Sequence, residues 1–301
     1  MTRPQRTLNR AAFFTLLLVA CMMGANHVAA RLAFNNGVDV ATAVAVRSSV
    51  TALLVTALLL IQGVSLRIHA RHHRALLTIG ALIAVQSLAL YSSVARLPVA
   101  LALLAFNTYP IWTALWDWLL YRRTPERAVL VAMPVLLFGL ALALDVLGAA
   151  SGLGAAGQWS RIGTGVAFAL TAAAAFGLAL VLTQHQTADV DGRLRTVSTL
   201  GLVGVLALAG ASAQGGLHLP HAAAGWWGLA LLTFFYGTAF TIMFTILPKL
   251  GVVGGSPIMN VEPVAALVLA WLVLDQAIAP MQIAGALLVV GVVMALGLRK
   301  R

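Results

Sequence analysis

Residues 107–119 read NTYPIWTALWDWL, and residues 260–272 read NVEPVAALVLAWL. The two stretches align without a gap, so that Asn, Pro and Trp recur in the order Asn-x-x-Pro-x₇-Trp at one offset of 153 residues. The same offset brings Gly24 onto Gly177. Apolar matches are common between membrane helices, but an ordered pattern of polar, proline and aromatic residues is not. We therefore interpret the chain as an internal duplication.

Both stretches lie in a chain that is apolar throughout. Of the 301 residues, 61% are hydrophobic and 9% are charged, whereas an ordinary soluble domain has about 25% charged residues. The mean hydropathy is +0.97, and apolar runs of about 20 residues recur, each long enough to cross the hydrocarbon core as a helix. The sequence therefore predicts an all-α membrane protein with ten transmembrane helices. These are expected at residues 12–34, 39–62, 75–94, 97–119, 127–144, 162–184, 195–214, 224–246, 252–273 and 280–297.

The basic residues indicate how these helices are oriented. Most of the 19 Lys and Arg residues fall in segments that share a side with the N-terminus, as expected of cytoplasmic loops. We therefore predict a multi-pass protein of the inner (plasma) membrane with both termini in the cytoplasm. The first apolar run continues beyond Cys21, so no signal-peptide cleavage is expected. Despite the net charge of +11, the charges do not gather on one amphipathic face, and no nucleic-acid partner is expected.

The duplication divides the ten helices into two repeats of five, at residues 1–145 and 158–301. Because five is an odd number, the second repeat enters the membrane from the opposite side, and the repeats are predicted to be inverted. Inverted repeats share a site near the middle of the membrane and can expose it alternately to either side. Pro110 and Pro263 stand at equivalent positions near the middle of two predicted helices and are expected to kink them. A purely structural kink is an equal alternative.

Several segments resemble the EamA-type permeases of the drug/metabolite transporter superfamily. The stretch NVEPVAAL at residues 260–267, followed by Trp271 and Asp275, is similar to their ninth helix. The stretch QIAGALLVVG at residues 282–291 is similar to their tenth helix. Further similar positions are residues 107–110 in the fourth helix, residues 24–31 in the first helix and Arg47 in the second.

This resemblance implies ten helices in two repeats around a central cavity, and export or exchange of small metabolites, often amino acids or related compounds. Two departures leave the substrate open: Met22 and Met23 stand where the family usually has tryptophan before the glycine, and Asp275 replaces a usual glutamate. The expected function is a secondary transporter that exports a small metabolite by alternating access. Its expected partners are the substrate and the lipid bilayer, with a coupling proton or other ion as a further candidate.

Ionisable side chains within the predicted helices are the first candidates for a substrate site, because a charge in lipid is costly and faces the protein interior or water. Glu262 stands beside Pro263, and burial makes it a candidate proton carrier or partner of a cationic substrate. Arg47 is a candidate partner of Glu262 or of a substrate carboxylate. For both residues the alternative is a structural bond between helices. Asn260 is a further candidate, although a regular helix places it nearly opposite Glu262.

Uncharged polar residues at similar depth form a second set of candidate substrate-binding residues. Such residues bond either to a substrate or to a neighbouring helix. The set consists of Asn26, His27, Gln86, Asn107, Tyr109 and Tyr236. Within it, Tyr109 occupies the position in the first repeat that Glu262 occupies in the second. The two side chains are therefore predicted to approach one site from opposite repeats.

The alternatives to a transporter are an intramembrane enzyme and a non-transporting membrane receptor. The sequence contains no Gly-x-Ser-x-Gly, no His-Glu-x-x-His and no paired intramembrane aspartates, so we expect neither enzymatic activity nor catalytic residues. No cofactor or metal is expected, and the single cysteine excludes a cysteine-rich metal site. The lack of a Walker motif leaves an ion gradient, or the gradient of the substrate itself, as the energy source. The motifs of the sequence identify neither the cargo nor the oligomeric state.

Overall fold

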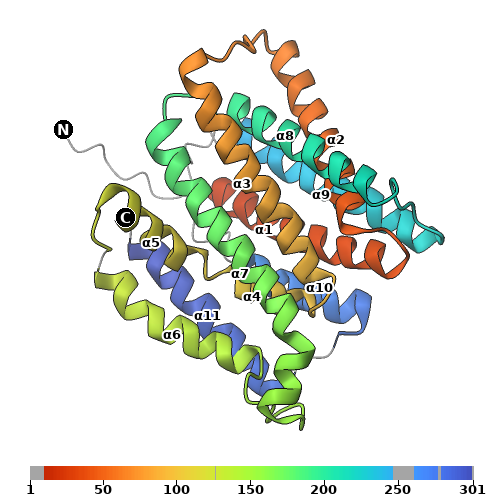
Figure 1. Ribbon diagram of the computed structural model, residues 1–301, viewed down its shortest axis with the longest axis vertical. Helices are drawn as coiled ribbons and strands as arrows, with labels where there is room; N and C mark the ends of the chain where they lie inside the picture. Colours follow the sequence, from red (N-terminus) through yellow and green to blue (C-terminus); the bar gives the residue numbers. More distant parts are fainter. Residues whose placement is uncertain (1–9, 126, 247–260, 277–278, 300–301) are drawn as a thin grey trace.

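The computed structural model describes residues 10–125, 127–246, 261–276 and 279–299, and the regular structure in these ranges is helical, without strands. The helices follow the predicted apolar runs closely (Figure 1). They are α1 (Arg10–Asn35), α2 (Val40–Ile61), α3 (Ala70–Val94), α4 (Val99–Phe106), α5 (Tyr109–Tyr121), α6 (Arg127–Ala143), α7 (Gly154–Gln186), α8 (Gly192–Ala213), α9 (Ala223–Thr245), α10 (Glu262–Leu274) and α11 (Pro280–Arg299).

Seven segments of the described chain are long and apolar enough to cross a membrane, with α4 and α5 together forming one of them. Three shorter apolar helices fall within α6, α10 and α11. The prediction of an all-helical membrane protein is confirmed, whereas the count of ten spanning helices stays a prediction. Most of the first half of the ninth predicted helix, residues 252–260, lies outside the described residues.

The fourth predicted helix differs from the expectation, because it is two helices rather than one kinked helix. Asn107 and Thr108 separate α4 from α5, and Pro110 stands in the first turn of α5. A proline there removes no helical hydrogen bond, because the first N–H groups of a helix have no partner within it. The Asn107 side chain donates to the Leu103 carbonyl at 3.1 Å at the end of α4. Pro263 likewise stands in the first turn of α10.

Helix α7, which corresponds to the sixth predicted helix, also begins earlier than predicted. The corresponding helix was predicted at residues 162–184, whereas α7 starts at Gly154. Gly148 and Gly152 adopt positive φ angles of 68° and 70°, a conformation that glycine reaches at little cost. These two turns are complete within a few residues, which leaves the rest of the segment free to join the helix.

The helices α5 and α10 are equivalent in detail. Each has 13 residues, and the offset of 153 maps one onto the other from end to end. Both end in a left-handed residue, Arg122 with φ 57° and Asp275 with φ 51°. The duplication seen in the sequence is therefore also present in the backbone conformation of these two helices.

Pairwise packing repeats the same correspondence. Helix α1 packs against α9 and α10, and its counterpart α7 packs against α3 and α5. Helix α2 packs against its own counterpart α8, as α6 does against α11, and Figure 1 shows these two pairs on opposite sides of α1 and α7.

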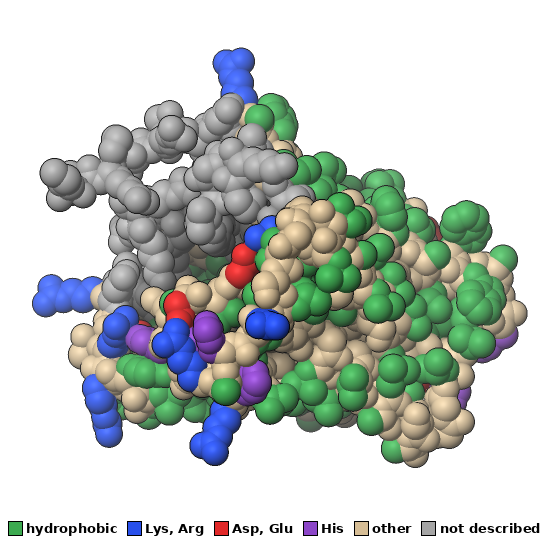
Figure 2. Space-filling model, turned by 90° about the horizontal axis from the view of Figure 1, so that it is seen from above, with side chains coloured by type: hydrophobic (Ala, Val, Ile, Leu, Met, Phe, Trp, Pro, Cys, Tyr) green, Lys and Arg blue, Asp and Glu red, His purple; other side chains and the backbone are tan. Residues whose placement is uncertain are grey.

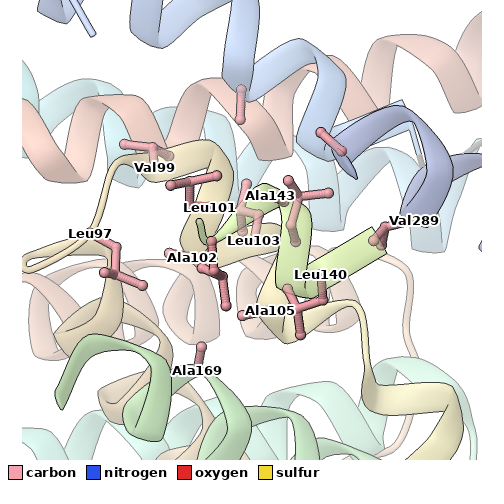
Figure 3. Close-up of a cluster of buried hydrophobic side chains, with 14 of the residues drawn as sticks. Leu97, Val99, Leu101, Ala102, Leu103, Ala105, Leu140, Ala143, Ala169 and Val289 are labelled. Carbon is pink, nitrogen blue, oxygen red and sulfur yellow. The ribbon is translucent and has the colours of Figure 1, made fainter. Parts of the chain in front are cut away.

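The largest apolar cluster surrounds α4, in which residues 99–105 are all buried. Figure 3 shows α4 side chains such as Leu103 between Leu140 of α6, Ala169 of α7 and Val289 of α11. This packing fixes the end of α4 and, with it, the start of α5.

Candidate functional site

The site begins where α1 crosses α10. Gly24 has no side chain, and a Cβ built on it would lie 3.0 Å from the Ala266 nitrogen and 3.0 Å from the Glu262 carbonyl oxygen. His27 lies one turn beyond Gly24 on the same face of α1. Its Nε2 is 3.1 Å from Oε1 of Glu262. The close approach of the two helices thus brings the predicted carboxylate against a histidine whose side chain is only 4% exposed.

Tyr91 of α3 joins this pair to the next helix. Its ring meets the His27 ring edge to face, with centroids 5.6 Å apart and planes at 80°, a geometry that aromatic quadrupoles favour. The Tyr91 hydroxyl donates a hydrogen bond to Oδ1 of Asn26 at 2.9 Å. Both Tyr91 and Asn26 are fully buried.

Arg47 of α2 lies between two tyrosine rings. Its guanidinium carbon is 4.3 Å from the Tyr91 ring centroid and 4.1 Å from that of Tyr236 on α9. A cation over an aromatic face is attracted by the ring quadrupole. Arg47 is 3% exposed, and it forms no ion pair with an acidic residue of the described chain.

Tyr109 approaches from the other repeat. It stands at the start of α5 and packs edge to face against Phe176 of α7, with ring centroids 5.2 Å apart. Its phenol is close enough to interact electrostatically with Glu262. That Tyr109 and Glu262 face one site from equivalent positions stays a prediction.

The structure thus groups six of the predicted site residues and separates the others. The grouped residues are Asn26, His27, Arg47, Tyr109, Tyr236 and Glu262. The side-chain amide of Asn107 is bonded to the backbone at the end of α4. The side-chain carbonyl oxygen of the half-buried Gln86 accepts a hydrogen bond from the hydroxyl of its neighbour Ser87 at 3.3 Å. Asn260 lies outside the described residues.

Tyr91 is the site residue that sequence reasoning missed. It stands in the last turn of the predicted helix 75–94, where tyrosine ordinarily anchors a helix at the membrane interface. Its contacts with Asn26, His27 and Arg47 come from two other helices. The one hint in the sequence is a hydroxyl-bearing aromatic residue near the end of an apolar run.

A second polar cluster ties α5 to the end of α7. The His185 Nε2 is 2.9 Å from Oδ1 of Asp117, and the His185 ring stacks on Tyr121 with centroids 3.7 Å apart. Nearby in sequence, Asp189 is paired with Arg71 at 2.6 Å. Burial acts to raise the pKa of Asp189, but a backbone hydrogen bond, His72 and Arg71 together hold this pKa below its ordinary value. In the described residues no three His, Cys, Asp or Glu side chains gather as metal ligands.

Comparison with known proteins decides the family. The model of the EamA-like transporter family matches residues 10–144 and again residues 163–298. The chain belongs to this family. The two matched segments start 153 residues apart, at the offset of the internal repeat. The EamA family is a family of membrane transporters, so membership indicates that this EamA protein transports small solutes.

A solved structure has the same fold as this EamA protein. A protein crystal structure matches with a TM-score of 0.63 and 18% sequence identity, over 97% of this chain and 99% of the other. At that identity the likeness shows the fold alone. No curated protein matches the sequence.

Proposed function

We propose that this EamA protein is a secondary transporter that exports a small metabolite, such as an amino acid or a related compound, by alternating access. The observation that carries the proposal is the His27–Glu262 pair. It joins α1 of the first repeat to α10 of the second, at the helix that begins beside Pro263. A titratable pair held between two repeats is suited to change partners when one repeat moves against the other.

The proposed architecture is ten spanning helices in two inverted repeats, with residues 1–145 in the first and 158–301 in the second. The equal lengths of α5 and α10 support it, as do the glycine contacts of α1 and α7. A Cβ on Gly24 would lie 3.0 Å from the Ala266 nitrogen, and a Cβ on Gly177 would lie 2.8 Å from the Thr113 nitrogen. Ala266 and Thr113 are themselves related by the offset of 153 residues. The same contact is thus made once by each repeat.

In the proposed orientation the protein spans the inner (plasma) membrane, and both termini lie in the cytoplasm. On the face seen in Figure 2, Lys and Arg gather toward one end of the molecule, whereas His lies at both ends and hydrophobic side chains cover much of the rest. This distribution supports a cytoplasmic end that carries the basic loops.

The proposed coupling uses Glu262. Its side chain is 22% exposed and is paired with His27. The carboxylate can therefore separate from the histidine and bind a proton or a cationic group of the cargo instead. Release of that proton or cation on the far side would restore the pair with His27. Such an exchange would link the movement of the repeats to an ion or substrate gradient.

A comparison of metabolites inside and outside cells that contain or lack the protein tests this proposal. We expect at least one small metabolite to accumulate inside the cells without the protein and to appear outside the cells with it. Equal distribution of every compound would contradict export.

A further inference from the structure

Arg47 is a buried cation without a counter-ion among the described residues. The chain has eight Asp and Glu residues, and seven of them lie in the described ranges. Five of these have an arginine or histidine side chain within ion-pair distance: Asp39, Asp117, Asp189, Asp191 and Glu262. Asp145 accepts backbone hydrogen bonds from Ala150 and Ser151, and Asp275 ends α10. The eighth, Glu126, immediately precedes α6 in the sequence.

An unneutralised guanidinium in the interior is costly. Removal of a charge from water is repaid only when the charge is paired and hydrogen-bonded. The Tyr91 and Tyr236 rings cover Arg47 and attract its charge, yet they offset only part of that cost. The guanidinium Nε has no hydrogen-bond partner. Arg47 therefore calls for an anion that the described chain does not supply.

Two residues near Arg47 carry a buried polar atom that can donate a hydrogen bond and has no hydrogen-bond partner. Buried side-chain atoms without a hydrogen-bond partner include Nδ2 of Asn26 and Oγ1 of Thr51. Asn26 is linked to Arg47 through Tyr91, whose hydroxyl donates to Oδ1 of Asn26 and whose ring lies against the guanidinium. Thr51 lies one turn after Arg47 on α2, where a Cβ on Gly237, the residue after Tyr236, would be 3.3 Å from its Oγ1. An amide N–H₂ can only donate, and a hydroxyl can donate. Partnerless donors around a cation favour an anionic acceptor.

We propose that Arg47 binds a carboxylate group of the cargo, held between the Tyr91 and Tyr236 rings. The proposal rests on the proposed transport function and names its substrate class: small organic acids, among them amino acids. A carboxylate offers two acceptor oxygens that match the planar fork of a guanidinium. The aromatic rings hold that fork in place before the cargo arrives. His27 is already paired with the Glu262 carboxylate. Arg47 is therefore the cationic group that is left for the acid.

Ligand-induced stabilisation of the purified full-length protein tests this site without requiring transport. The thermal unfolding midpoint is measured in detergent micelles, in a low-salt buffer without carboxylate, phosphate, sulfate or chloride, with each of the 20 amino acids, lactate and succinate. Each acid is compared with its amide at the same concentration, and sodium chloride serves as an inorganic anion. The variants are Arg47→Gln, Arg47→Lys and, as a matched control, Arg161→Gln, which removes an exposed arginine.

At least one acid is expected to raise the midpoint of the wild type by several degrees, because a ligand that binds only the folded state stabilises it. Its amide is expected to have no effect. Arg47→Gln should bind that acid at least tenfold more weakly, Arg47→Lys should retain part of the response, and Arg161→Gln should respond as the wild type does. Without ligand, Arg47→Gln should unfold at or above the wild-type midpoint, because the replaced group is an unneutralised charge.

Four results would overturn the proposal: no acid stabilises the wild type, the amide stabilises as well as the acid, chloride alone produces the Arg47-dependent shift, or Arg47→Gln responds as the wild type does. A lower ligand-free midpoint of Arg47→Gln with an unchanged response to acids would make Arg47 structural. The assay separates this inference from the proposed function. A protein that binds carboxylates but exports nothing would refute the exporter and leave the site standing.

Discussion

Glu262 is the residue on which the proposed mechanism depends most. Its carboxylate is 3.1 Å from His27 and interacts with Tyr109 of the other repeat. A charge between repeats is useful to a transporter only if it changes partner during the cycle. A bond that merely joins α1 to α10 would instead contribute to stability in every state.

Substitution of Glu262 distinguishes these roles. Glu262→Gln keeps the size and the hydrogen-bonding capacity but removes the charge, so we expect export of the cargo to fall at least tenfold. Tyr109→Phe removes only a hydroxyl and should reduce export by a smaller factor. Initial efflux rates from preloaded cells measure both, normalised to the amount of folded protein in the membrane. Wild-type rates in both variants would show that neither residue belongs to the site.

The residues of the site were predictable to different degrees. Glu262 and Arg47 stand out in the sequence because a charge within a long apolar run is rare and costly. Their partners were not predictable in the same way. The contact of Arg47 with Tyr91 and Tyr236 joins three helices, and only the packing of those helices selects it. The pairing of Glu262 with His27, rather than with Arg47, has the same origin.

Among the elements, the crossings of α1 with α10 and of α7 with α5 hold the site together. Each crossing depends on one glycine, Gly24 or Gly177, whose missing side chain admits the backbone of the partner helix. Small residues are common where membrane helices approach closely, because packing and not hydrophobicity drives their association.

Gly177→Ala is therefore expected to destabilise the protein. Its Cβ would lie 2.8 Å from the Thr113 nitrogen and 3.0 Å from the Trp112 carbonyl carbon, and backbone atoms cannot move aside cheaply. Overpacking of this kind costs about 1–3 kcal/mol. The matched control is Gly201→Ala in α8, where nothing lies within 4 Å of the added Cβ and alanine favours the helix by up to about 1 kcal/mol. Thermal unfolding midpoints of the purified variants provide the comparison, and equal midpoints would contradict the close crossing.

The break between α4 and α5 shows how far element prediction reaches. Pro110 marked the position of an irregularity in the sequence, because proline disturbs a helix interior. Whether the helix bends or stops depends on Asn107, whose side chain bonds to the Leu103 carbonyl at the end of α4, and on the buried cluster that holds α4. Both are tertiary features that a pattern of apolar residues does not contain.

For the whole molecule, the helical membrane fold followed from composition and the length of the apolar runs, because lipid leaves a chain of this kind no other way to satisfy its backbone. The duplication was visible because three residue types recurred in order. The orientation rests on the positive charges alone.

Reporter fusions test that orientation. Alkaline phosphatase is active only outside the cytoplasm, whereas green fluorescent protein fluoresces when fused on the cytoplasmic side. We expect fluorescence from a fusion after Arg301 and phosphatase activity from a fusion after Gly216, between α8 and α9. Phosphatase activity at the C-terminus would rule out a cytoplasmic C-terminus.

The central claim is that the chain exports a small metabolite through a site built around Glu262. The most direct measurement is the metabolite comparison between cells with the wild type, with Glu262→Gln and without the protein. We predict that at least one small metabolite is depleted inside and enriched outside only when the wild type is present, and that Glu262→Gln behaves like the cells without protein. The same distribution of every metabolite in all three cell types would contradict the account.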